Sequence, residues 1–464
     1  MADIRDFRIV VAKDAQYNER RAAIFVSNGI KAVTGKRLPM VSDESEPSEH
    51  EIVIGKTSRE QTFGVDFSRD RDGAKSFRIK YIDGRLYITH LGTSKEMPEE
   101  EPPYDPAVAY DNGDYGLMYA AYYFIDFVLG YRCIIPSLDT LENKGAIEID
   151  GRCDFDYTGE FFSTHMPKRF DGAAMYFVPA SAQPNITQCC IFKTREGKLA
   201  VLDGGIPANA EHLVSILEYL WEGEGKPVVS AWMLSHLHGD HYGAYVRINQ
   251  TPELAERIKI ENFYCDLLDY SFYERIGDGI GWAQNALNAV LRDYESTGAK
   301  VNKVVSGQKI ALDEMTFEVV HTPTEIMNEE KKPFLCCNIN DTSVVYKLHY
   351  DNKQTVLLLT DAEASCSINM LKNHREQLKC DIVQYGHHGG QSVSKECYAA
   401  TGAKMSITPQ GVHGWFCDGG EAPSQTELGI RRSLSYMCEQ GIKPENILCD
   451  MFGTLSFELP IEIK

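Results

Sequence analysis

The feature that most constrains this chain is the run His236-Leu237-His238-Gly239-Asp240-His241, which directly follows an apolar segment from Val228 to Leu234. The apolar segment has the length and composition of a buried strand. In α/β sheets, residues just beyond the carboxyl end of such a strand often carry the chemistry. The alternative is a solvated loop between a strand and a helix. We favour a functional site, because four imidazole or carboxylate side chains in six residues rarely gather there by chance.

Imidazole nitrogens and carboxylate oxygens are the side-chain ligands that suit zinc. Two zinc ions about 3.5–4 Å apart need several such ligands held by a rigid frame. His236 and His238 are alternate residues, so both side chains can point to one ion. Asp240 and His241, on a turn opened by Gly239, can then point to its neighbour. The run therefore predicts part of a two-metal site.

The run resembles the signature of the metallo-β-lactamase superfamily. A hairpin is expected from Gln188 to Asp203, and Asp203-Gly204-Gly205 at its end looks like the Asp-Gly turn that precedes the signature in that family. A plain β-turn is the alternative for these three residues. The resemblance implies an αββα metallo-β-lactamase sandwich over residues 172–464, as the catalytic domain of an α/β protein.

The resemblance also implies further ligands at the ends of later strands, and the sequence offers His321, Asp361 and the pair His387-His388. They follow the apolar segments 317–320, 356–359 and 382–385. Asp361 would bridge both ions. We favour His387 as the ligand and His388 as the substrate-facing acid or hydrogen-bond donor.

Two of these residues have plainer alternatives. His321, beside Pro323, could be a hydrogen-bonded histidine with no metal. Asp361 could be the N-cap of a helix expected from Ala362 to Leu371. The strands expected in front of them place both residues where a ligand is needed, so we favour the ligand interpretation for each.

Three runs narrow the resemblance: Asn338 to Ser343, Leu357 to Asp361, and Asp381 to Gly389. They look like the branch that includes the nuclease-like domain of competence DNA-uptake channels and the phosphorylcholine esterases, from about Met175 to Leu459. The chain departs from the DNA-uptake branch at Ala422-Pro423, where that branch has a His-Pro pair.

The branch implies hydrolysis of a phosphoester or phosphodiester by a metal-bridging hydroxide, with Asp240 orienting the water and His388 as the second catalytic residue. A lactone, thioester or amide hydrolase on the same site is the alternative. His238 stands where the flavo-diiron relatives have a glutamate, and an all-imidazole first site suits two Zn²⁺ ions, with Mn²⁺ or Fe²⁺ as the other candidates.

Substrate contacts are expected from His413 and Trp415, on a glycine-flanked loop after the segment Met405 to Thr408. An ordered surface loop is the alternative. The aromatic residues between 252 and 300 are expected in the core rather than on a substrate platform.

Residues 1–160 predict a separate small α/β domain. A helix is expected from 15 to 34 with Gly35 as its C-cap, and Asp83-Gly84 predicts a hairpin. A second helix is expected from Tyr115 to Leu129. The region resembles the noncatalytic α/β domain that precedes the barrel in β-hexosaminidases and α-glucuronidases, although no barrel follows here. This likeness favours a small-molecule or glycan-linked substrate, with a carbohydrate-binding scaffold protein holding a structural metal as another alternative.

The net charge of -20 opposes nonspecific nucleic-acid binding. The longest apolar stretch, Leu117 to Leu129, is too short for a membrane span of about 20 residues. Thirteen cysteines without regular spacing do not form a disulfide framework. We therefore expect a cytoplasmic protein, while export with a removed signal peptide and the oligomeric state stay open.

Overall fold

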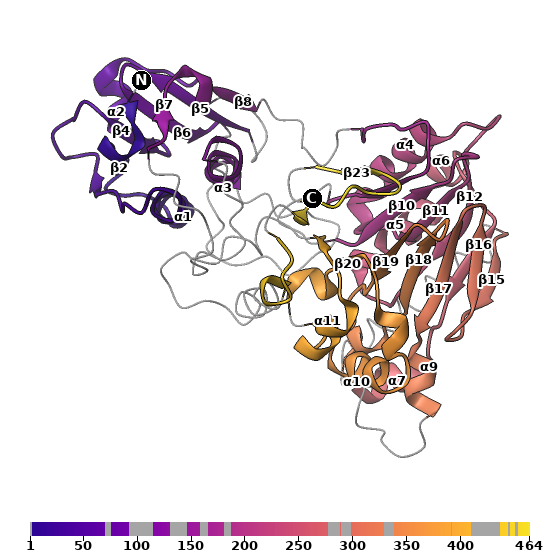
Figure 1. The fold of residues 1–464 in the computed structure, drawn as a ribbon. Coiled ribbons are helices and arrows are strands. Elements are labelled where there is room, and N and C mark those ends of the chain that lie inside the picture. Colours follow the sequence, from indigo (N-terminus) through magenta and orange to yellow (C-terminus); the bar gives the residue numbers. More distant parts are fainter. Residues whose placement is uncertain are drawn as a thin grey trace. The chain divides into compact units, whose positions relative to one another are not determined.

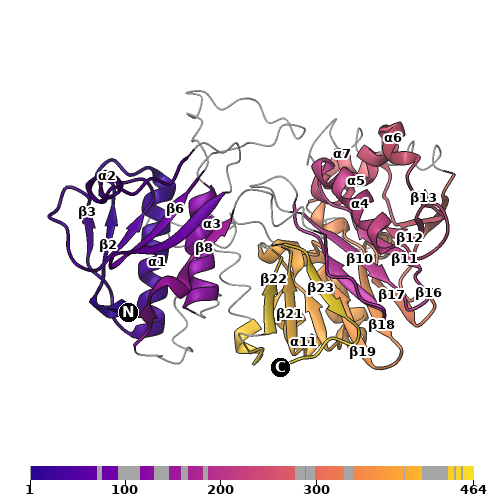
Figure 2. The same cartoon turned by 90° about the horizontal axis from the view of Figure 1, so that it is seen from above.

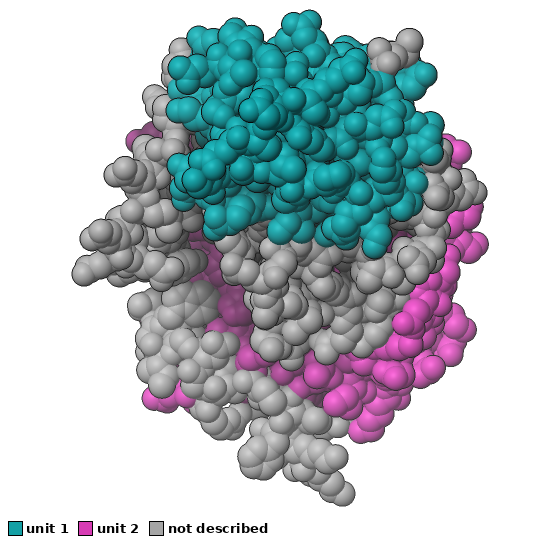
Figure 3. All heavy atoms as spheres, turned by 90° about the vertical axis from the view of Figure 1, so that its left-hand side faces the viewer, with its two compact units in different colours: residues 1–105, 110–161, 415–425 teal, residues 106–109, 162–414, 426–464 magenta. Residues whose placement is uncertain are grey.

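The structure is a computed structural model of the chain. It describes residues 2–69, 76–91, 115–129, 146–157, 166–180, 187–276, 288, 298–328, 338–390, 392–409, 437–443, 446–450 and 453–464. The described residues up to 157 belong to one compact unit and those from 166 onward to a second, and Figure 3 colours the two units separately.

The first unit contains a six-stranded sheet in the order β3-β2-β4-β6-β5-β8. Its strands are β2 (Arg8–Val11), β3 (Met40–Ser42), β4 (Glu51–Ile54), β5 (Phe77–Ile82), β6 (Arg85–His90) and β8 (Phe155–Tyr157). The first four in spatial order are parallel, whereas β5 runs antiparallel to both neighbours. A separate ladder joins β1 (Ala2–Asp3) to β7 (Glu148–Ile149).

The helices of this unit are α1 (Tyr17–Thr34), α2 (Ser58–Phe63) and α3 (Tyr115–Tyr123), and α3 continues as a π-helical turn over Phe124–Val128. Gly35 ends α1 with φ of 75°, so the predicted C-cap is confirmed. Asp83 and Gly84 have φ of 46° and 84° between β5 and β6, which confirms the predicted hairpin.

A buried carboxylate organises one end of this sheet. Glu51 is fully buried on β4, and its oxygens lie 2.6 Å from Arg8 Nη2 and 3.0 Å from Arg59 Nε. Arg85 Nε lies 3.5 Å away. Burial opposes ionisation of Glu51, but hydrogen bonds from Arg8 and Arg59 outweigh it and lower the pKa of the carboxyl group.

We expect Glu51→Gln to weaken the first unit, because it leaves buried guanidinium groups without their anion, at a cost of about 3–5 kcal/mol. Hydrogen-exchange mass spectrometry of peptides from β2 and β4 in the full chain measures this as protection that falls by at least about a hundredfold. The matched control is Glu49→Gln, at a side chain that is 89% exposed.

The lowered pKa of Glu51 also predicts how the stability of the first unit depends on pH. A lowered folded-state pKa means that the stabilisation is present above the unfolded pKa of about 4.3 and is lost as the pH falls through the folded value. Wild-type protection in β2 and β4 should therefore fall on acidification below about pH 4.3 more steeply than that of Glu51→Gln. Equal slopes would contradict the role given to Glu51.

The second unit contains two larger sheets. The first has the order β15-β14-β12-β11-β10-β9-β23, with β13 paired to β12. Its strands are β9 (Ala174–Phe177), β10 (Cys189–Lys193), β11 (Leu199–Asp203), β12 (Val228–Met233), β13 (Lys259–Ile260), β14 (Asn262–Cys265), β15 (Lys300–Lys303) and β23 (Leu455–Glu458). The antiparallel pair β10/β11 confirms the hairpin predicted from Gln188 to Asp203.

The second sheet has the order β16-β17-β18-β19-β20-β21-β22. Its strands are β16 (Lys309–Leu312), β17 (Met315–His321), β18 (Val345–Tyr350), β19 (Gln354–Leu358), β20 (Ile382–Gln384), β21 (Met405–Thr408) and β22 (Ile447–Cys449). The strands from β16 to β19 are antiparallel to their neighbours and those from β19 to β22 are parallel.

The two sheets pack through a shared apolar core. Alternate residues of the first sheet, such as Cys190 and Phe192 on β10, join Phe317 and Val319 from β17 in one buried cluster. The intervening side chains, such as Ile191, face a second cluster with α4 (Ala210–Leu220) and α5 (Gly239–Gln250). These two helices lie on the side of the first sheet that faces away from the second sheet (Figure 2).

Other helices flank the sheets. They are α6 (Pro252–Ala255), α7 (Tyr270–Ile276), α9 (Pro323–Asn328), α10 (Ala364–Asn373) and α11 (Lys395–Thr401) (Figure 1). Of the aromatic residues expected in the core, Phe263, Phe272 and Tyr273 are buried, while Trp282 lies outside the described residues. Among the helices that the structure describes, no helix is both long and apolar enough to cross a membrane.

Candidate metal centre

The first group of candidate ligands lies where β12 passes into α5. His236 follows the strand, His238 is the N-cap residue of α5, and Asp240 and His241 lie in its first turn. Gly239 opens this turn, as the sequence predicts, but the turn does not need the conformational freedom of glycine. Gly239 is the first residue of the helix, and a Cβ atom added there would meet nothing within 4 Å.

Glycine is required in a different turn, the one that follows β11. Gly204 and Gly205 have φ of 137° and 93°. A Cβ atom would lie 2.9 Å from the Trp232 ring at Gly204 and 2.5 Å from Thr187 Oγ1 at Gly205. The turn therefore needs both glycines, and it fixes the position of Asp203.

Two groups of ligand atoms converge around Asp361. One comprises His236, His238 and Asp361, and the other comprises Asp240, His241, Asp361 and His388. Within each group the ligand atoms all lie within 4.8 Å of one another. The structure thus brings six of the residues predicted from the sequence together, with the carboxylate of Asp361 common to both groups.

The distances around Asp361 show how close the side chains lie. Its Oδ2 is 3.1 Å from His241 Nε2 and 3.8 Å from His236 Nε2. Its Oδ1 is 3.5 Å from His388 Nε2, and that nitrogen is 3.1 Å from Asp240 Oδ2. Asp361 is only 2% exposed, so these contacts form in the protein interior.

Several of these buried atoms lack the hydrogen bonds that interior polar atoms normally make. His241 Nε2 and Asp361 Oδ1 are buried without a hydrogen bond, although ion-pair distances connect them to the rest of the cluster. Atoms that converge without bonding one another are what a shared cation would satisfy. One group offers two imidazole nitrogens and one carboxylate and the other two imidazole nitrogens and two carboxylates, and both donor sets fit zinc.

The electrostatics of the cluster lead to the same conclusion. Burial opposes the charged forms, but the histidines lower the pKa of Asp361 well below its usual range, with His241 the largest contributor. In return, Asp361 and Asp240 outweigh burial and raise the pKa of His388 to about 10. Burial and the neighbouring histidines His241 and His238 lower the pKa of His236. The carboxylates of Asp361 and Asp240 thus favour positive charge next to them.

Two acceptors outside the predicted set of ligands, the Asp203 carboxylate and the Pro409 carbonyl, fix the orientation of the His241 and His388 rings. Asp203 Oδ2 accepts a hydrogen bond from His241 Nδ1 at 2.8 Å, and Ser235 donates to the same carboxylate through its N–H and its hydroxyl. The carbonyl of Pro409 lies 2.9 Å from His388 Nδ1. Because Nδ1–H is used in both rings, Nε2 keeps its lone pair for the centre. The signal for Asp203 was the Asp-Gly-Gly turn.

The tandem histidines divide differently from the sequence expectation. His388, which is 2% exposed, lies within the second group. His387 lies outside it, with its Nε2 4.0 Å from Asp361 and its Nδ1 2.9 Å from Glu363 Oε1. The side chain of His387 is 27% exposed. The geometry therefore favours His388 as the ligand and His387 as the residue at the rim.

Two further expectations differ from the structure. His321 is fully buried but belongs to neither group; the side-chain amide of Asn369 lies 2.9 Å from its Nδ1, and its Nε2 has no hydrogen bond. Burial lowers the pKa of His321 to about 4. The N-cap alternative for Asp361 is wrong, since Glu363 precedes α10. His413 and Trp415 lie outside the described residues.

The backbone around the centre is strained. Among the described residues, nine that are not glycine have positive φ, and four of them are Asp203, Thr360, His387 and His388. Each such residue costs on the order of 1–3 kcal/mol. The remaining five lie in turns or loops and are not candidate ligands. Strain of this kind persists only where the surrounding structure enforces it, and it gathers at functional sites.

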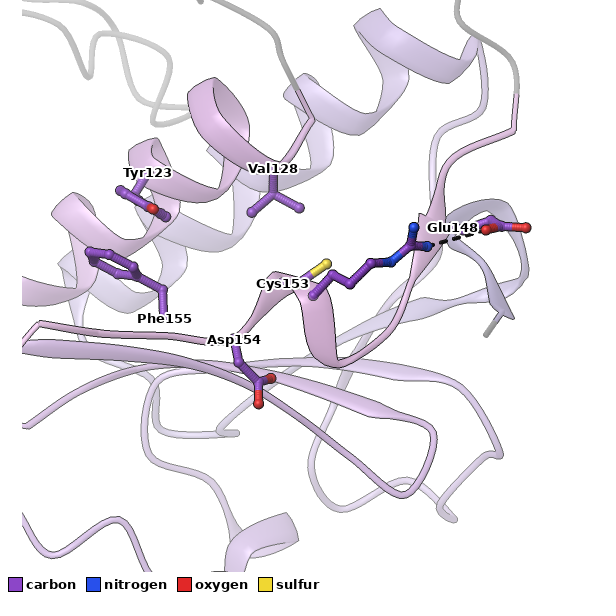
Figure 4. A pocket seen from close by; sticks show the side chains of 7 residues that line it. Tyr123, Val128, Glu148, Cys153, Asp154 and Phe155 are labelled. Atoms are coloured by element: carbon purple, nitrogen blue, oxygen red, sulfur yellow. Dashed lines mark hydrogen bonds and ion pairs between the residues drawn. The ribbon is translucent and has the colours of Figure 1, made fainter.

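A different concave feature lies in the first unit. A pocket of about 470 Å³ is lined by Tyr123, Val128, Glu148, Arg152, Cys153, Asp154 and Phe155 (Figure 4). Tyr123 stacks on Phe155 with ring centroids 4.0 Å apart, and Arg152 pairs with Glu148 at 3.2 Å. None of the candidate metal ligands lines it.

Comparison with known proteins gave structural likenesses only. No family model and no curated protein matches the sequence. The metallo-β-lactamase fold protein YhfI from Bacillus subtilis is similar over 61% of this chain and 99% of its own, with 11% identity and a TM-score of 0.36. Zn²⁺-bound PqqB from Methylobacterium extorquens is similar over 60% of this chain and 88% of its own, with 8% identity and a TM-score of 0.34.

The diiron β-hydroxylase CmlA from Streptomyces venezuelae is similar over 62% of this chain, with 11% identity and a TM-score of 0.38. This chain spans 54% of the length of CmlA. Likenesses at this distance transfer neither an activity nor a set of ligands.

We expect Asp203→Asn to weaken metal binding about 10- to 100-fold, because the amide no longer fixes His241 in the ligating tautomer. Chelator competition with zinc measures the affinity. Asp313→Asn is the matched control: Asp313 also has a left-handed backbone and accepts bonds from Thr194 and Lys198, but in a turn of the other sheet. Equal losses in both variants would count against the orienting role.

The two tandem histidines serve as controls for each other. Asparagine tolerates the left-handed backbone that both positions have. We expect His388→Asn to reduce bound zinc from about two ions to about one, and His387→Asn to leave the metal content unchanged. Metal analysis of the dialysed proteins decides, and the reverse pattern would restore the original preference for His387.

Proposed function

We propose that this chain is a hydrolase with two zinc ions in an αββα sandwich of the metallo-β-lactamase type. The observation that carries the proposal is the pair of ligand groups around one buried carboxylate, Asp361. A structural zinc is usually enclosed by four protein ligands and needs no neighbour. The two groups share a ligand, the second includes the partly exposed Asp240, and the partly exposed His387 lies next to it, which suits a catalytic pair better.

In this proposal His236, His238 and Asp361 hold one ion, and Asp240, His241, Asp361 and His388 hold the other. His321 belongs to neither group, but its Nε2 is buried without a hydrogen bond, so it stays a candidate for a further ligand. Imidazole-rich sites suit zinc, and the carboxylates of the second group would also accept Mn²⁺ or Fe²⁺.

When bound, the two ions supply Lewis acidity and lower the pKa of a water molecule toward about 7. Asp240, which is 21% exposed and 3.1 Å from His388 Nε2, would orient that water through its carboxylate. His387 offers a ring at the rim to the substrate. Glu363 fixes this ring, and is itself held by the side-chain amides of Asn338 at 2.9 Å and Asn340 at 2.8 Å.

The substrate class we favour is a phosphoester or phosphodiester. Its support is the resemblance to the branch of the superfamily with nuclease-like and phosphorylcholine esterase members, which is a likeness of sequence runs and carries less weight than the centre itself. The resemblance of residues 1–160 to domains of glycan-processing enzymes favours a substrate attached to a glycan. A lactone, thioester or amide would fit the same centre.

Hydrolysis of bis-p-nitrophenyl phosphate by zinc-loaded protein tests the proposal. We expect turnover that Asp361→Asn lowers by at least about a hundredfold, because both ions lose a charged ligand. Asp351→Asn, in the hairpin turn between β18 and β19, should leave turnover unchanged. Parallel assays with lactone, thioester and amide substrates separate the alternatives, and turnover of those substrates alone would replace the phosphoester assignment.

A further inference from the structure

The loops that carry Asp361 and His388 leave neighbouring parallel strands. β19 and β20 pair in register at Leu358 and Gln384, so both loops begin at the same edge of the sheet. Both loops contain left-handed backbone at residues other than glycine: φ is 51° at Thr360, 46° at His387 and 52° at His388. Neither conformation is favoured locally, so contacts between the loops must maintain them.

One buried side chain joins the two loops. Gln384 is fully buried at the end of β20, and its Oε1 accepts a hydrogen bond from the Thr360 N–H at 2.6 Å. Its Nε2 lies 3.4 Å from the Thr360 carbonyl and also donates to the carbonyl of Tyr385. The Thr360 carbonyl in turn accepts the His387 N–H at 2.8 Å. The carboxamide thus connects the residue before Asp361 to the segment that leads into His388.

We propose that Gln384 is a positioning residue that sets the separation of Asp361 from His388 and so completes the second ligand group, an inference that rests on the proposed metal centre. The carboxamide suits this role because it provides an acceptor for Thr360 N–H and donors for the two carbonyls. Glutamate has no donor for those carbonyls, and an apolar side chain leaves the Thr360 N–H buried without a partner.

The competing explanation is that Gln384 only fills space between neighbouring strands. The chain contains a matched control for this. Gln354, at the other end of the same sheet on β19, is also buried, and its side-chain amide makes the same kind of pair, accepting from Ile461 N–H at 2.7 Å and donating to Ile461 carbonyl at 2.8 Å. Methionine has a similar shape to glutamine, so it keeps the packing at both sites and removes the hydrogen bonds.

The experiment compares Gln384→Met, Gln384→Glu and Gln354→Met in the full chain by zinc titration against a chromophoric chelator. We expect Gln384→Met to weaken the second of two zinc ions about 10- to 100-fold and to weaken the first, which shares Asp361 but not His388, less. Gln384→Glu keeps the acceptor and should lie in between. Gln354→Met should leave both ions unchanged.

Hydrogen exchange provides the second readout. Gln384→Met should increase exchange in peptides that cover residues 359–363 and 385–390, and Gln354→Met should not. Unchanged zinc affinity and unchanged exchange in Gln384→Met would overturn the positioning role, as would equal effects of both methionine variants. Wild-type protein that binds two ions yet hydrolyses no phosphodiester would overturn the substrate assignment alone, because the titration does not depend on turnover.

Discussion

The buried carboxylate of Asp361 is the interaction on which the candidate centre depends. An isolated carboxylate in the interior is costly, and it is tolerated only when opposite charge and hydrogen-bond donors surround it. Here the compensating groups come from both sheets: His236 and His241 follow β12, and His388 follows β20. The packing of one sheet on the other therefore decides whether Asp361 is stabilised.

The surrounding backbone shows what this arrangement requires. Asp203, Thr360, His387 and His388 all adopt conformations that side chains other than glycine avoid. Each is held by specific bonds, such as those from Ser235 to Asp203 and from His387 N–H to Thr360. The backbone here adopts conformations that are not favoured locally, and hydrogen bonds stabilise each of them. This combination is typical of a functional site rather than of a core optimised for stability.

Much of the second unit follows from the sequence because its signals are periodic. The hairpin predicted from Gln188 to Asp203 is the pair β10/β11, and the segment Met405 to Thr408 forms β21. In the first unit, the turn at Asp83-Gly84 also depends on a local signal, because these two residues themselves favour its left-handed backbone. The ends of β12, β19 and β20 placed most of the candidate ligands for the same reason.

What the sequence did not predict depends on contacts between distant segments. Nothing local distinguishes His387 from His388; the difference arises because the carbonyl of Pro409 holds one ring and Glu363 the other. His321 also ends its strand as expected, yet the position of its ring depends on Asn369 from α10. The contribution of Asp203 required knowing that its carboxylate reaches His241 across 38 residues of chain.

The position of the ligands also connects metal binding to folding. The first sheet contributes the run His236 to His241, and the second contributes Asp361 and His388, so a cation held by both groups joins the two layers of the sandwich. Because an unfolded chain does not gather these ligands, the free energy of binding a cation there would add to the stability of the packed sheets. On the proposed function, the centre would be both the site of hydrolysis and a link between the two sheets.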